Sequence, residues 1–139
     1  MTSQLNVDTI KGNETAGSIT IQGEGSATTN LQQGLGKCWV KLDGTALSGT
    51  GTTGVGDSFN LTSTTDNGAG NYTVTMNNDM SSAHYSTPVA PNADLTSSGY
   101  GLYGGAVTHT TGSFVLISKR QDNPVDSNYF GVTVHGDLA

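Results

Sequence analysis

Cysteine, proline, charge and long apolar runs are all scarce in this chain of 139 residues. Its one cysteine, Cys38, excludes a disulfide within the chain. Three prolines, with no glycine at every third position, exclude a collagen-like triple helix. No run approaches the ~20 apolar residues of a membrane-spanning helix, and the first five residues do not begin a signal peptide. We therefore expect synthesis in a cytoplasm and no insertion into a membrane.

Positive charge is scarce as well, and this bears on the partners of the protein. Only 5 residues are Lys or Arg against 11 Asp or Glu, which gives a formal net charge of −6. Binding to nucleic acid requires clustered cations that neutralise phosphates, and the one adjacent basic pair is Lys119 and Arg120. The composition therefore argues against nucleic acid as a ligand.

Small polar residues are what the chain has in abundance. Gly, Thr, Ser and Asn together make up nearly half of the sequence, whereas the Ala, Glu, Lys, Leu and Arg of helical bundles are few. Thr, Val and Tyr favour strands, and Gly and Asn favour the turns between them. The composition predicts an all-β protein with many tight turns and a thin core.

The first 36 residues differ from the rest because they contain no aromatic side chain. Two short runs alternate apolar and polar residues as β-strands do, at residues 5–10 and 18–21, and residues 27–35 suit one helical turn or an extended connector. A segment with so little bulk cannot bury its own apolar side chains. We predict that it is an attachment arm, which docks on another surface through Leu5, Val7, Ile10, Ile19 and Ile21.

Residues 37–139 show the alternation of a folded β domain. Strands are predicted at residues 38–42, 58–63, 71–76, 83–86, 113–118 and 129–135, with a hairpin turn at residues 66–70, a stop at Pro88 and Pro91, and a loop at residues 97–105. Short strands at this spacing are typical of an antiparallel β-sandwich or a jelly-roll-like barrel. The predicted core consists of Phe59, Leu61, Tyr72, Val74, Phe114, Leu116, Val132 and Val134, with Cys38, Val40 and Leu42 on one face of their strand and Trp39 on the other.

The usual signatures of chemistry are missing from the sequence. Residues 34–37 resemble the end of a phosphate-binding loop but lack its first glycine and its Ser or Thr. The three histidines, His84, His109 and His135, form no closely spaced metal-binding pair, although copies of one histidine can meet on an oligomer axis. No paired acids or nucleophile motif accompany them, and Cys38 is expected in the core. We expect no catalytic site, no cofactor and no metal, and hence no enzyme.

Two tyrosines are the best candidates for recognition. Tyr100 and Tyr103 are flanked by Gly99, Gly101, Gly104 and Gly105, in a setting rich in Gly and Ser that is typical of adaptable binding loops. Rings of this kind stack on the apolar face of a sugar. The alternative is that both tyrosines pack against a neighbouring subunit, and the sequence leaves both open.

A family resemblance emerges from the motifs taken together. Residues 5–11 and 18–25 resemble the amino-terminal region of small fibre-like virion proteins of marine bacteriophages, cyanophages among them. The stretches 37–40, 57–61, 66–74 and 132–138 resemble a domain that recurs in such proteins, whereas residues 77–112 match it poorly. These are strand and turn motifs, so the resemblance implies a structural family without catalytic residues.

The resemblance implies a place in a virion that is assembled in the host cytoplasm. We expect a short fibre or tail appendage, joined by its arm to tail, neck or capsid proteins, and a homo-oligomer, most simply a trimer as in other phage fibres. Distal loops would then contact a glycan or protein of the host cell surface. The alternative is a capsid-decoration or head-fibre protein with a purely structural role.

Overall fold

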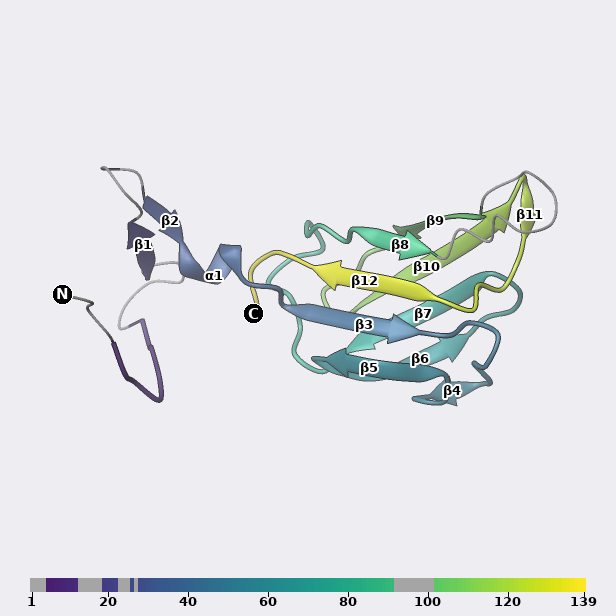
Figure 1. Ribbon diagram of the computed structural model, residues 1–139, viewed down its shortest axis with the longest axis horizontal. Helices are drawn as coiled ribbons and strands as arrows, with labels where there is room; N and C mark the ends of the chain where they lie inside the picture. Colours follow the sequence, from purple (N-terminus) through teal and green to yellow (C-terminus); the bar gives the residue numbers. More distant parts are fainter. Residues whose placement is uncertain (1–4, 13–18, 23–25, 27, 92–101) are drawn as a thin grey trace. The chain divides into compact units, whose positions relative to one another are not determined.

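The computed structural model describes residues 5–12, 19–22, 26, 28–91 and 102–139, and the chain divides into two compact units, Met1–Leu35 and Gly36–Ala139. The first unit contains β1 (Thr20–Gln22), β2 (Thr28–Asn30) and a single helical turn, α1 (Leu31–Gly34) (Figure 1). The second unit contains β3 (Cys38–Leu42), β4 (Thr50–Gly51), β5 (Val55–Phe59), β6 (Leu61–Asp66), β7 (Asn71–Met76), β8 (Val89–Pro91), β9 (Leu102–Val107), β10 (Ser113–Arg120), β11 (Asn123–Pro124) and β12 (Phe130–Val134).

The first unit is built around a small hairpin. β1 and β2 pair in antiparallel fashion with Thr20 opposite Asn30, and the Leu31 amide donates a hydrogen bond to the Ile19 carbonyl at 2.9 Å. Residues 28–34 are thus first extended and then helical, which combines the two predicted alternatives. Residues 5–12 form no strand, so the strand-like interpretation of residues 5–10 is wrong; no described strand pairs with them.

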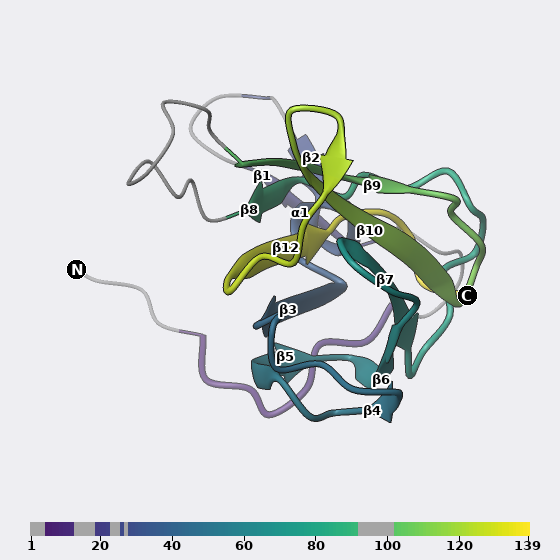
Figure 2. The same ribbon diagram turned by 90° about the vertical axis from the view of Figure 1, so that its right-hand side faces the viewer.

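The second unit is an antiparallel β-sandwich, as the sequence predicts. One sheet has the order β5-β3-β12-β8, and the other has the order β11-β10-β7-β6-β4 with β9 on the free edge of β10. Figure 2 shows the two sheets face to face, with β3 and β12 across from β7 and β10. In each sheet the central pair joins strands that are not consecutive in the sequence: β3 pairs with β12, and β7 pairs with β10. Strands that are distant in the sequence are therefore neighbours in both sheets of the sandwich.

The core lies between the sheets and follows the alternation of the strands. The completely buried side chains include those of Tyr72, Phe114 and Phe130, and the whole buried cluster comprises Cys38, Val40, Leu42, Leu47, Tyr72, Val74, Met76, Met80, Phe114, Leu116, Phe130, Val132 and Val134. Six of the eight predicted core residues belong to it, and Leu61 packs partly buried against it. Phe59 does not, because its side chain is 54% exposed.

Asn60 is the reason why the prediction for Phe59 is wrong. Its φ of 57° breaks the predicted strand 58–63 into β5 and β6, which belong to different sheets. The Asn60 side chain fixes this crossing, since its Nδ2 donates to the carbonyl of Lys37 at 2.9 Å and its Oδ1 accepts from the amide of Asn78 at 2.7 Å. The alternation therefore does not run through the break, and Phe59 points outward.

Two further predicted segments differ in the structure. Residues 83–86 form no strand but only a bridge from Ser86 to His135, and the strand lies later, at β8. β8 ends on Pro91 instead of being stopped before it, because an edge strand tolerates a residue without an amide hydrogen. The predicted loop 97–105 is strand from Leu102 onward, since the long strand β10 pairs with β9 despite its glycines.

The predicted hairpin is confirmed between β6 and β7, and a polar contact beside it connects the sheet to the last strand. Its turn uses positive φ at Gly68 and Gly70. The amide of Gly70 and the hydroxyl of Tyr72 both donate to Asp126 Oδ1, at 2.7 and 2.6 Å. Burial, and then the hydrogen bond to Asp126, raise the pKa of Tyr72 above its ordinary value. The segment before β12 is thereby held against β7.

Candidate functional site

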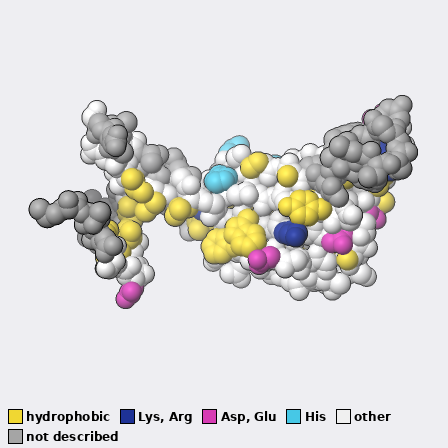
Figure 3. Space-filling model, viewed as in Figure 1, with side chains coloured by type: hydrophobic (Ala, Val, Ile, Leu, Met, Phe, Trp, Pro, Cys, Tyr) yellow, Lys and Arg dark blue, Asp and Glu magenta, His cyan; other side chains and the backbone are white. Residues whose placement is uncertain are grey.

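The outer face of the four-stranded sheet carries three exposed aromatic side chains among the described residues of the second unit: Trp39, Phe59 and Tyr129. Cys38, Val40 and Leu42 of β3 point into the core, so Trp39 and Lys41 point outward. Trp39 of β3 lies opposite Phe59 of β5. The side chain of Trp39 is 38% exposed and that of Phe59 is 54% exposed. Figure 3 shows hydrophobic side chains, with basic and acidic side chains beside them, on one surface of the second unit.

Strand register fixes the neighbours on this outer face. Trp39 lies opposite Phe59 on one side and Thr133 on the other. Two residues further along β3, Lys41 lies opposite Asp57 and Gly131. Apolar, charged and hydroxyl side chains thus alternate on the outer face, with one position that carries no side chain.

Tyr129 covers that empty position. A Cβ placed on Gly131 would lie 3.4 Å from the Tyr129 hydroxyl oxygen and 3.7 Å from its ring, so the ring lies directly above the glycine. The ammonium of Lys41 lies 5.4 Å from the ring centroid, within the range of a cation–π interaction. Tyr129 is still 40% exposed.

The backbone under Tyr129 is fixed by the buried side chain of Ser127. The Ser127 hydroxyl donates to the carbonyl of Tyr129 at 2.7 Å, and the Ser127 carbonyl accepts from the amide of Gly44 at 2.7 Å. The next residue, Phe130, is completely buried. The Tyr129 ring is therefore attached to a well-defined part of the core.

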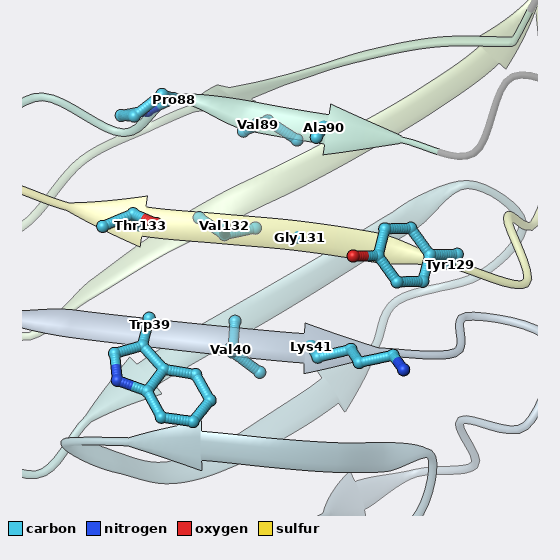
Figure 4. A pocket seen from close by; sticks show the side chains of 10 residues that line it. All are labelled: Trp39, Val40, Lys41, Pro88, Val89, Ala90, Tyr129, Gly131, Val132 and Thr133. Atoms are coloured by element: carbon cyan, nitrogen blue, oxygen red, sulfur yellow. The ribbon is translucent and has the colours of Figure 1, made fainter.

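Two hollows lie on the outer face. The first, of about 480 Å³, is lined by Trp39, Val40, Lys41, Pro88, Val89, Ala90, Tyr129, Gly131, Val132 and Thr133 (Figure 4). The second, of about 280 Å³, is lined by Lys41, Leu42, Asp43, Gly54, Gly56, Asn128 and Tyr129. Both share Lys41 and Tyr129, so the two side chains separate adjoining hollows. This outer face is the candidate site.

Of the two rings at this site, only Trp39 could be expected on an outer face from the sequence pattern. The alternation of residues 38–42 places Trp39 opposite the core, which predicts an exposed indole. Tyr129 was missed as its companion because it lies in a distant segment, and only the pairing of β3 with β12 brings them to one face. A glycine inside a predicted strand was the available hint, since it often marks a close approach of other groups.

The predicted recognition tyrosines are not placed at this site. Tyr100 lies outside the described residues, and the backbone of Tyr103 is in β9 of the other sheet, opposite Lys119. All five predicted arm residues lie within the described parts of the chain. Four of them are exposed: Leu5, Val7, Ile10 and Ile21. Ile19 is partly buried.

The histidines take separate structural positions. His109 Nε2 lies 2.8 Å from the hydroxyl oxygen of Thr87, and its ring contacts Tyr85 at 4.9 Å between centroids. His135 forms a backbone bridge with Ser86. Within the described parts of the chain, no three His, Cys, Asp or Glu side chains gather closely enough to hold a metal ion. No helix in those parts has the length and apolar character to cross a membrane.

Cys38 is completely buried, and burial raises the pKa of its thiol from the ordinary 9.0 to about 11. Above pH 9 the unfolded chain loses this proton while the folded chain keeps it, so the free energy of unfolding decreases as the pH rises. From pH 9 to 10 we expect a loss of about 1 kcal/mol from this residue. Urea unfolding of the native chain and of Cys38→Ala at both pH values measures this loss. An equal loss in the variant would show that the pH dependence does not come from Cys38.

Comparison of the chain with family models, with curated protein sequences and with solved structures gives no match.

Proposed function

We propose that the protein is a structural subunit of a bacteriophage virion, a short fibre or tail appendage attached through residues 1–36. The observation that carries the proposal is the exposure of apolar side chains in the first unit. Leu5 is 78% exposed, and Val7, Ile10 and Ile21 are each about half exposed. Burial of such side chains away from water is favourable, so the segment is suited to dock on another protein.

The resemblance of the strand and turn motifs to fibre-like virion proteins supports the same proposal. A compact β-sandwich with an acidic surface and an apolar arm suits a subunit that remains soluble until it is assembled. We propose a homo-oligomer, most simply a trimer, in which the arm contacts sister copies and other virion proteins. Burial of surface between copies adds stability to a thin core.

Light scattering of the purified full chain tests the arm. We expect an oligomer, and we expect Leu5→Asp with Val7→Asp to convert it to a smaller species, because two charges enter an apolar interface. The matched control is Val107→Asp, an exposed apolar residue of the second unit. A monomeric native chain, or an oligomer that the arm variant leaves intact, would refute this part of the proposal.

The virion role is tested on particles purified from infected cells. Quantitative mass spectrometry gives the copy number of the chain relative to the major capsid protein. We expect few copies, as for a tail or neck appendage, whereas a copy number that follows the capsid lattice would establish the decoration role instead. Absence of the chain from the particles would refute both.

A further inference from the structure

We infer that the outer face of the β5-β3-β12-β8 sheet is a binding site for a neutral oligosaccharide, which lies across the rings of Trp39 and Tyr129. The inference does not rest on the virion proposal, because it concerns the chemistry of the second unit alone. The two rings are called the aromatic platform below.

The orientation of the rings is the first argument. Figure 4 looks onto the outer face and shows both rings open to the viewer, so each lies along the sheet with one face toward solvent. The flat C–H face of a pyranose stacks on an aromatic face of this kind. An aromatic side chain that served only as protein core would be buried, whereas Trp39 and Tyr129 are 38% and 40% exposed.

The polar side chains around the platform are the second argument. A sugar has hydroxyl groups around its edge, which require hydrogen-bond partners next to the stacking surface. Thr133 lies beside Trp39, and Lys41 lies two residues from Trp39 along β3, with its ammonium against the Tyr129 ring and Asp57 across from it. This mixture matches the alternation of apolar faces and polar edges in a saccharide.

The shape of the face is the third argument, and it favours a chain of sugars. The hollows of about 480 and 280 Å³ adjoin at Lys41 and Tyr129, so an elongated ligand can occupy both. Gly131 leaves room for the Tyr129 ring on the floor of the larger hollow, because a Cβ there would lie 3.4 Å from the Tyr129 hydroxyl oxygen. The volume of the larger hollow, about 480 Å³, lies in the range of small-ligand sites.

Charge and area distinguish this ligand from other occupants. Lys41 is flanked by Asp57 in the register and by Asp43 in the smaller hollow, so the face offers no surplus of positive charge to a polyanion. A stable contact between two proteins needs about 800 Å² from each partner, with an apolar centre. Here the exposed rings are interrupted by charged side chains and hollows, which suits a small polar ligand better than a second copy.

The test uses the full chain, labelled with a fluorophore, on an array of immobilised oligosaccharides of three to six units. The array holds neutral glucans, mannans and galactans, with sulfated glycans as the anionic comparison. We expect saturable binding to at least one neutral class. Trp39 is the single tryptophan of the chain, so the soluble form of that oligosaccharide should also shift the intrinsic emission.

Variants measured by titration calorimetry assign the binding to the platform. Trp39→Ala and Tyr129→Ala should each weaken it by about tenfold or more, a change that corresponds to about 1.4 kcal/mol. Tyr129→Phe keeps the ring and should bind within about threefold of the native chain. Val107→Ala, on the other sheet, is the control and should bind like the native chain.

Three results would overturn the inference. They are binding to no neutral class on the array, binding that survives Trp39→Ala with Tyr129→Ala, and binding only to sulfated glycans with loss at moderate salt. A change of oligomeric state in the platform variants would also overturn it, since the face would then be a contact between copies. Thermal unfolding of each variant confirms that it is folded, and Tyr129→Phe provides the folded comparison if Tyr129→Ala is not.

Discussion

Phe114→Ala is expected to lower the free energy of unfolding by about 3–5 kcal/mol, the range for removal of a buried aromatic side chain. Phe114 is completely buried, lies opposite Val74 in the pairing of β10 with β7, and contacts the rings of Tyr85 and His109 at 6.4 and 6.3 Å between centroids. The substitution leaves a cavity in the buried cluster that lies between the two sheets. Urea unfolding measures the loss.

Phe59→Ala is the matched control for this prediction. It removes the same atoms from a side chain that is more than half exposed, so we expect a loss of about 1 kcal/mol or less. Similar losses for the two variants would mean that Phe59 is buried in solution, either in the core or between copies of the chain. Measurements at several protein concentrations separate those two cases.

Gly70→Ala is expected to be at least as damaging as Phe114→Ala. Gly70 has a φ of 63°, and a Cβ there would collide with the Ser118 carbonyl oxygen and lie 2.8 Å from the Val125 amide. Both are backbone atoms, which cannot move aside as a flexible side chain can. The shift would also strain the hydrogen bond from the Gly70 amide to Asp126. We expect a loss of more than about 4 kcal/mol, or no folded protein.

Gly49→Ala separates the clash from the backbone conformation. Gly49 has the same φ of 63°, but a Cβ there meets nothing within 4 Å. Its cost should be that of a left-handed alanine alone, about 1–2 kcal/mol. Equal losses in Gly49→Ala and Gly70→Ala would show that the close approach at Gly70 does not matter.

The strands of the core were predictable because each one alternates without interruption. Tyr72 and Val74 in β7, and Val132 and Val134 in β12, are buried as the period of two requires. This reasoning fails at Asn60. Its left-handed conformation lets the chain cross from one sheet to the other within a segment that the sequence pattern presents as one continuous strand. Asn is the residue other than Gly that most readily adopts such a conformation, so the position was a recognisable risk.

The candidate site was less predictable than the core because it depends on pairing between distant strands. Trp39 and Thr133 become neighbours only when β12 lies beside β3, and nothing local to either strand specifies that choice. The orientation of the Tyr129 ring further depends on Gly131 beneath it and Ser127 before it. A sequence pattern reports which side of a strand is buried, but it does not report which strands share a face.

The central position of β12 has a consequence for how the protein is made. β12 comes last in sequence among the described strands, yet it lies between β3 and β8, and Val134 pairs with Cys38. During synthesis on the ribosome, the sheet therefore cannot close until residues 130–134 have emerged, and pairing across so long a separation is slow. A product truncated before Phe130 would leave two open strand edges, which promote aggregation. Only a chain that includes β12 can therefore present the aromatic platform.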